Sequence, residues 1–132
     1  MDSSIISAIV VAGVVFIALR MLPRLLAGVP FIDPKDVATR LEDNPDAIMI
    51  DVRTPEEFNA GHVRDSLNVQ PHELGENMEE KKAYLDNKIY VMCLSSQRAA
   101  MAAKSMKNLG FTNVSVVKGG LNLWKKRGLP VI

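Results

Sequence analysis

The sequence of 132 residues contains a single cysteine, Cys93, and this scarcity excludes two classes of structure. One cysteine cannot form a disulfide within the chain, so the chain does not resemble a small secreted domain held together by disulfides. It also cannot supply the several thiolates of a structural zinc site. We therefore expect a protein that works in a reducing compartment.

Carboxylates are absent from the C-terminal part of the chain. Residues 87–132 contain eight lysines or arginines and no aspartate or glutamate, whereas residues 33–86 contain fourteen carboxylates and six bases. The formal net charge of +1 is thus a cancellation between an acidic and a basic segment. The basic segment includes Cys93 and favours an anionic substrate, an anionic membrane surface, or simply a basic face beside an acidic one.

Aromatic residues and repeats are also scarce. Aromatics make up 5% of the sequence and hydrophobic residues 48%, with no low-complexity tract and no internal repeat. This composition is typical of a folded globular chain, and the length fits one compact domain rather than two. The basic residues are not interleaved with aromatics and form no motif that reads bases, so we expect no nucleic acid among the partners.

The longest apolar run lies near the N-terminus, where Ser3–Leu19 contains no charged residue. Extended past Arg20 and Arg24, whose long side chains can reach lipid headgroups, the run is long enough for a membrane-spanning helix of roughly 20 residues. We therefore expect membrane lipid to contact residues 3–27. The positive-inside tendency predicts a single-pass protein with its N-terminus outside and its domain in the cytoplasm, at the inner membrane if the organism is a bacterium.

Two alternatives to a retained anchor are open. A cleaved signal peptide has basic residues before its apolar run, but here only Asp2 precedes the run and the arginines follow it. An amphipathic helix lying on the membrane surface would need a polar face, and this run is apolar on all sides. We assign residues 1–28 to an anchor helix with its linker and residues 29–132 to the folded domain.

Within the folded domain, short apolar runs alternate with helical patterns. Buried strands are predicted at residues 47–52 and 88–93, and a helical apolar stripe follows the second of them: Ala99, Ala102, Ala103, Met106 and Leu109. This alternation predicts an α/β domain with a parallel sheet and right-handed crossovers. Ligands of such sheets bind at the carboxyl ends of the strands, which is where Cys93 lies.

Cys93 stands between a predicted strand and a helix that begins near Gln97 or Arg98. The backbone N–H groups and the dipole at such a turn stabilise an anion, and Arg98 adds a full positive charge. The intervening residues suit a tight loop around a terminal atom, being small or polar apart from the first: Leu94, Ser95, Ser96 and Gln97. The alternative is a buried thiol that only fills space, because free cysteine is among the most buried residue types.

Other residues with reactive or metal-binding side chains have a structural interpretation. His62 and His72 have no second ligand at metal-binding spacing. Asp51 and Arg53, together with Glu56 and Glu57, could act as acids or bases but are expected to be structural, forming buried or half-buried charge pairs that brace the nearby turns. Four methionines and the tryptophan are predicted to pack in the core: Met49, Met92, Met101, Met106 and Trp124.

Three ordered segments resemble the signatures of single-domain rhodaneses, a family of sulfurtransferases. The segment IDVRTPEEFNAGHVRDSLNV (residues 50–69) is similar to the first signature and VVKGGLNLWKKRGLPV (residues 116–131) to the closing one. Between them, CLSSQR (residues 93–98) lies at the position of the active-site loop. The resemblance covers about residues 30–132 and implies a rhodanese-like α/β domain, with a central parallel sheet of about five strands flanked by helices and preceded here by one transmembrane helix.

The resemblance also implies a chemistry. Cys93 would be the nucleophile that accepts a sulfane sulfur from a small anionic donor such as thiosulfate, or from a low-molecular-weight or protein persulfide, and passes it to a thiol or to cyanide. The loop backbone would hold the terminal sulfur, with Arg98 carrying charge or bracing the loop. This assigns substrate binding to Leu94, Ser95, Ser96, Gln97 and Arg98. Neither a metal nor an organic cofactor is implied.

The loop departs from its relatives in ways that refine this expectation. Related dual-specificity phosphatases and arsenate reductases place five residues between cysteine and arginine; here there are four, which favours sulfur. The family often reads CxxGxR, and Ser96 stands at the glycine position, so we expect either a positive φ or an altered loop there. Leu94 stands where efficient thiosulfate users often carry a basic or polar residue, which favours a persulfide donor. A non-catalytic, membrane-tethered binding module remains the alternative function.

Overall fold

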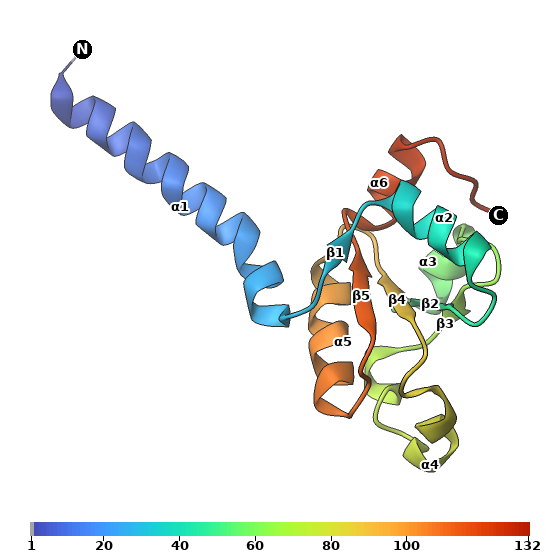
Figure 1. Cartoon of the computed structure of the whole chain (residues 1–132). Helices are drawn as coiled ribbons and strands as arrows, with labels where there is room; N and C mark the ends of the chain where they lie inside the picture. The colour runs from blue at the N-terminus through green and yellow to red at the C-terminus, as the bar shows by residue number, and fades with distance from the viewer. Residues whose placement is uncertain (1) are drawn as a thin grey trace.

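A computed structural model describes residues 2–132, with the side chains of residues 23–27 excepted. The expected contact of the Arg24 side chain with headgroups therefore lies outside the described residues. Helix α1 (Ser3–Ala27) begins after Asp2, whose Oδ1 accepts a hydrogen bond from the Ser4 N–H at 3.2 Å. Figure 1 shows α1 projecting away from the rest of the molecule.

The N-terminal helix is long and apolar enough to cross a membrane. Its stretch Ser3–Leu22 has a mean hydropathy of 2.6, and none of it is buried within the molecule. The apolar side chains lie exposed on every side, with Ile9 and Phe16 each 61% exposed. By length and composition this is the one such helix in the described part of the chain.

A parallel sheet of five strands forms the centre of the domain, with the order β1-β5-β4-β2-β3. Its strands are β1 (Phe31–Ile32), β2 (Ile48–Asp51), β3 (Leu67–Asn68), β4 (Ile89–Met92) and β5 (Val114–Val117). The central strand β4 is buried at every position, as expected for a strand covered on both faces.

Helices cover both faces of this sheet (Figure 1). They are α2 (Pro34–Asp43), α3 (Pro55–Ala60), α4 (Met78–Lys81), α5 (Gln97–Asn108) and α6 (Gly120–Lys126), with 3₁₀ turns at Pro71–Glu73 and Lys82–Tyr84. The α/β class and the parallel five-stranded sheet expected from the sequence are confirmed.

Alternate residues of β4 face two separate core clusters. Ile89 and Val91 pack with α5, whereas Tyr90 and Met92 pack with α2 and α6. Small side chains on the buried stripe of α5 let that helix lie close against the sheet: Ala99, Ala102 and Ala103, followed by Met106. Met101 was predicted to lie in this core, but it is 74% exposed because its position falls off the stripe.

Because all five strands are parallel, their carboxyl ends meet at one edge of the sheet. Cys93 directly follows β4 at this edge, Lys118 directly follows β5, and Arg53 lies two residues after the end of β2. Segments far apart in the sequence are thereby brought around the only thiol of the chain.

Candidate active site at the carboxyl end of β4

The Cys93 thiol is buried and is also held at a strand-to-helix turn. The residue is only 1% exposed, and its Sγ accepts a hydrogen bond from the Ser96 N–H at 3.0 Å. Both features considered from the sequence are therefore present together: the thiol is buried, and it lies at the turn before a helix. Burial limits access, while the turn supplies a donor aimed at the sulfur.

Ser96 has the unusual backbone conformation on which this contact depends. Its φ of 90° lies in the left-handed region, as anticipated for a position where relatives often carry glycine. Serine in this region costs on the order of 1 kcal/mol. The Ser96 carbonyl accepts the first helical hydrogen bond, from the Ala100 N–H at 2.9 Å, so α5 begins directly after the turn.

The start of α6 holds the loop from the other side. The Leu121 N–H donates to the Cys93 carbonyl at 2.8 Å, and the Asn122 N–H donates to the Leu94 carbonyl at 3.1 Å. Gly120, at φ 60°, lies so close that an added Cβ would be 2.4 Å from the Cys93 carbonyl oxygen. Sequence reasoning missed these contacts, although the paired glycines of the closing signature mark the place.

Arg98 braces the loop against α3. Its Nη1 and Nη2 donate to the two Glu57 carboxylate oxygens at 2.7 and 2.9 Å, a bidentate pair. Arg98, with hydrogen bonds from Thr54, lowers the pKa of the Glu57 carboxyl to about 2. In return the hydrogen bond with Glu57 raises the pKa of Arg98.

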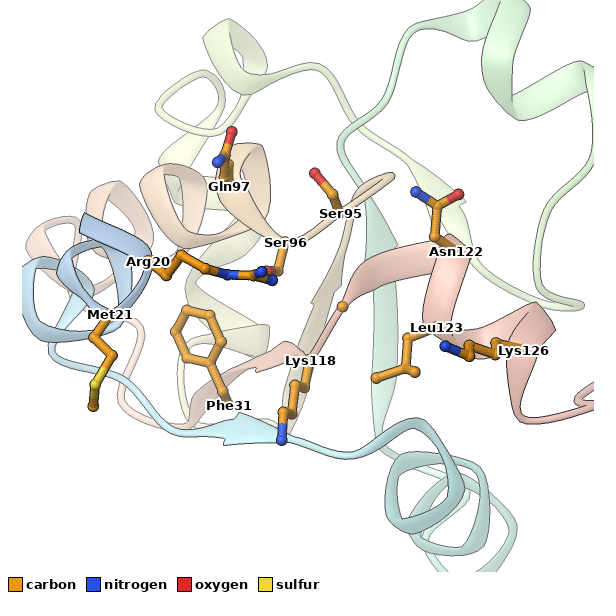
Figure 2. Close-up of a pocket in the computed structure, with 11 residues that line it drawn as sticks. Arg20, Met21, Phe31, Ser95, Ser96, Gln97, Lys118, Asn122, Leu123 and Lys126 are labelled. Carbon is orange, nitrogen blue, oxygen red and sulfur yellow. The ribbon is translucent and has the colours of Figure 1, made fainter. Parts of the chain in front are cut away.

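The other predicted loop residues lie at the surface. Leu94 is 40% exposed, and its carbonyl accepts a hydrogen bond from α6. Ser95 and Gln97 are also exposed, and together with Ser96 they line a pocket of about 590 Å³ beside the loop (Figure 2). Within the described residues, no group of three or more His, Cys, Asp or Glu side chains could hold a metal ion.

A buried ion pair supports the same edge of the sheet. Arg53 Nη2 lies 2.8 Å from Asp51 Oδ2, with side-chain exposures of 4% and 1%, and Nη2 also donates to the Gly61 carbonyl. The structural interpretation of this pair is confirmed. It is confirmed as well for His62, whose Nδ1 contacts the Phe58 carbonyl at 2.8 Å and whose ring stacks on that of Phe58.

A Glu57→Gln variant should show how much the Arg98 brace contributes. The pair is partly exposed, so we expect a loss of roughly 0.2–1 kcal/mol in the free energy of unfolding near neutral pH. Glutamine keeps an oxygen that can accept from the Thr54 N–H and so preserves the capping of α3. The measurement is urea unfolding of variant and unmodified chain from pH 7 to pH 3.

The pH dependence of this difference has a definite sign. The folded pKa of Glu57, about 2, lies below the ordinary value of 4.5, so the pair stabilises the fold above about pH 4.5 and loses this contribution as the pH falls toward 2. The two unfolding curves should therefore converge in acid. Glu56→Gln on the exposed side of the same helix is the control, and an equal effect from it would show that the Glu57–Arg98 pair contributes nothing specific.

A family model described as a rhodanese-like domain matches residues 33–127 of the chain. A sulfurtransferase from Allochromatium vinosum is 30% identical over 101 residues, which cover 76% of this chain and 92% of the relative. A thiosulfate sulfurtransferase from Pseudomonas syringae is 33% identical over 79 residues, covering 60% of this chain and 73% of the relative. The family match contains the first signature and the Cys93 loop, and it ends within the closing signature.

The fold of the chain is also similar to that of solved protein structures. The crystal structure of a rhodanese-related protein from Thermoplasma volcanium superposes with a TM-score of 0.67 at 29% identity, covering 78% of this chain and 97% of that one. The part of the chain that follows α1 therefore has known structural counterparts.

Proposed function

The chain belongs to the rhodanese-like family, and we propose that it transfers sulfane sulfur through a persulfide formed on Cys93. Relatives named as sulfurtransferases, at 30% and 33% identity, support sulfur transfer at the level of the family. The observation that carries the assignment to this residue is the hydrogen bond from the Ser96 N–H to the Cys93 Sγ, at the N-terminus of α5.

The proposed reaction has two displacement steps. In the first, the Cys93 thiolate attacks the sulfane sulfur of the donor: a new S–S bond forms on Cys93, the S–S bond of the donor breaks, and its electron pair leaves on sulfite or on a thiolate. In the second, an acceptor thiolate or cyanide attacks the outer sulfur, and the electron pair of the broken S–S bond returns to Cys93 as thiolate. No outside oxidant or reductant is consumed.

The chain's own residues stabilise the negative charge in both steps. The Ser96 N–H points at the sulfur, and the α5 dipole adds partial positive charge. Arg98 stays close enough for its charge to interact with Cys93 while it is paired with Glu57. The four residues between cysteine and arginine leave a loop that we assign to sulfur rather than to a tetrahedral oxyanion.

We propose a persulfide, of low molecular weight or on a protein, as the donor in preference to thiosulfate. Leu94 presents an exposed apolar side chain at the loop, which offers thiosulfate no charge or hydrogen bond.

We further propose that α1 anchors the domain to a membrane, with the domain in the cytoplasm. The unburied apolar stretch Ser3–Leu22 and the arginine that follows Leu19 support this proposal.

The test is the mass of the full-length chain after incubation with cysteine persulfide or with thiosulfate. We expect a gain of one sulfur atom, about 32 Da, on the peptide that contains Cys93, with a greater extent from the persulfide. Cyanide or a thiol should remove the added mass, and chain alkylated beforehand is the control. Absence of an adduct with every donor would favour the non-catalytic binding module instead.

A further inference from the structure

The pocket beside the Cys93 loop is built jointly by the N-terminal helix and the domain. Arg20 comes from α1, Phe31 from β1, Ser96 from the loop, and Lys118 and Lys126 from the β5–α6 region. In Figure 2 the Arg20 side chain extends from α1 toward the loop that carries Ser96. Cys93 itself is not among the described residues that line the pocket, whereas its neighbours Ser95, Ser96 and Gln97 are.

The junction that forms the pocket is fixed by contacts on both sides of the linker. Helix α1 packs against α5, and Lys107 Nζ donates to the Gly28 carbonyl at 3.1 Å. Just after the linker, Phe31 is paired with Val116 in the sheet. These contacts hold the end of α1 against the domain.

The pocket is positively charged. Arg20, Lys118 and Lys126 line it, and its described lining contains no carboxylate. The salt bridges within the described residues use Arg53, Lys82, Arg98 and Arg127, so no carboxylate lies within 4 Å of the three pocket cations. The hydrogen bond from Arg127 is the main cause that lowers the pKa of Asp33, and the positive charge of Lys118 lowers this pKa further.

The position of the pocket along α1 indicates where its ligand comes from. Arg20 and Met21 lie at the end of the apolar stretch Ser3–Leu22. If this stretch spans the bilayer, as proposed above, its end lies at the level of the lipid phosphates. Phe31 and Leu123 add apolar surface beside the cations, which suits a headgroup attached to a glycerol backbone.

We propose that this pocket binds the phosphate of an anionic lipid headgroup through Arg20, Lys118 and Lys126. This inference rests on the proposed membrane anchoring and is independent of the proposed sulfur transfer. Because Ser96 borders the pocket and donates its N–H to Cys93 Sγ, the bound headgroup lies against the loop that holds the thiol. The reactive edge of the domain would then face the membrane surface.

The test is native mass spectrometry of the full-length chain in detergent, titrated with short-chain phosphatidylglycerol. We expect one lipid retained per chain, and an apparent affinity at least about tenfold weaker in the triple variant Arg20→Gln, Lys118→Gln, Lys126→Gln. The matched control is Lys35→Gln, Lys104→Gln, Lys125→Gln, which removes the same charge from exposed positions outside the described pocket lining. The single variant Arg20→Gln should also weaken retention if the triple variant is unstable.

Two further measurements distinguish a lipid phosphate from a free phosphate ion as the ligand of the pocket. Phosphatidylcholine should be retained weakly, and inorganic phosphate at equal concentration should not displace phosphatidylglycerol. Displacement by inorganic phosphate would overturn the lipid assignment in favour of a soluble anion, and equal losses in the two triple variants would show only diffuse attraction. Retention of the chain in membranes after a carbonate wash tests the anchor separately, and the Cys93 adduct tests sulfur transfer separately.

Discussion

Replacing Cys93 with alanine or serine should lower sulfur transfer by at least about a thousandfold and abolish the sulfur adduct. Cys93 is the only cysteine in the chain, so no second thiol can take over the sulfur. Serine preserves a hydroxyl where Sγ accepts from the Ser96 N–H, but an oxygen nucleophile cannot form the persulfide. The measurement is the rate of thiocyanate formation with cyanide as acceptor, together with intact mass after exposure to cysteine persulfide.

The serine variant also separates chemistry from stability. Cys93 is 1% exposed, so alanine leaves a small void and an N–H without its acceptor, whereas serine fills most of the space and keeps an acceptor. Serine should therefore unfold at a urea concentration closer to that of the unmodified chain than alanine does. Turnover retained in a folded serine variant would place the nucleophile elsewhere and refute the mechanism.

The local features of this molecule follow from local sequence. The unbroken apolar runs predicted the strands that the structure shows as β2 and β4. The glycine position of the loop signature gave the left-handed turn at Ser96. Each of these depends on residues within a few positions of one another, so periodicity and turn chemistry are enough to predict them.

Contacts between distant segments could not be predicted in the same way. Glu57 was grouped with structural charges, and its pairing with Arg98 across 41 positions depends on how α3 lies over the loop. Arg20 was expected only at lipid headgroups, although it also lines a pocket with Lys118, which follows β5, and with residues of α6. Such pairings are set by the packing of whole elements, on which the side-chain pattern of one segment carries no information.

Gly120→Ala is the second change with a large expected effect, and it tests the approach of α6 to the loop. The added Cβ would lie 2.4 Å from the Cys93 carbonyl oxygen and 2.5 Å from the Leu94 carbonyl carbon. Both atoms belong to the backbone, so no side chain can rotate away to make room. We expect sulfur transfer to fall by about a hundredfold and the free energy of unfolding to drop by roughly 2–4 kcal/mol.

Gly128→Ala is the matched control for this change. Gly128 also has a positive φ, of 74°, but an added Cβ there would meet nothing within 4 Å. Alanine at Gly128 therefore has the backbone cost of the left-handed region, about 1 kcal/mol, without the clash. Urea unfolding and thiocyanate formation, measured for both variants, isolate the contribution of the close contact. Equal losses in the two would mean that the loop tolerates displacement of α6.

The outcome at Gly120 bears on how the loop works. Hydrogen bonds from Leu121 and Asn122 to the carbonyls of Cys93 and Leu94 can form only if α6 begins almost in contact with the loop, and the absent side chain of Gly120 permits this. These bonds turn the two carbonyls toward α6, which leaves the Ser96 N–H directed at Sγ. A carbonyl turned toward the thiolate would repel it, so in the proposed mechanism the position of α6 would stabilise the sulfur through the loop backbone.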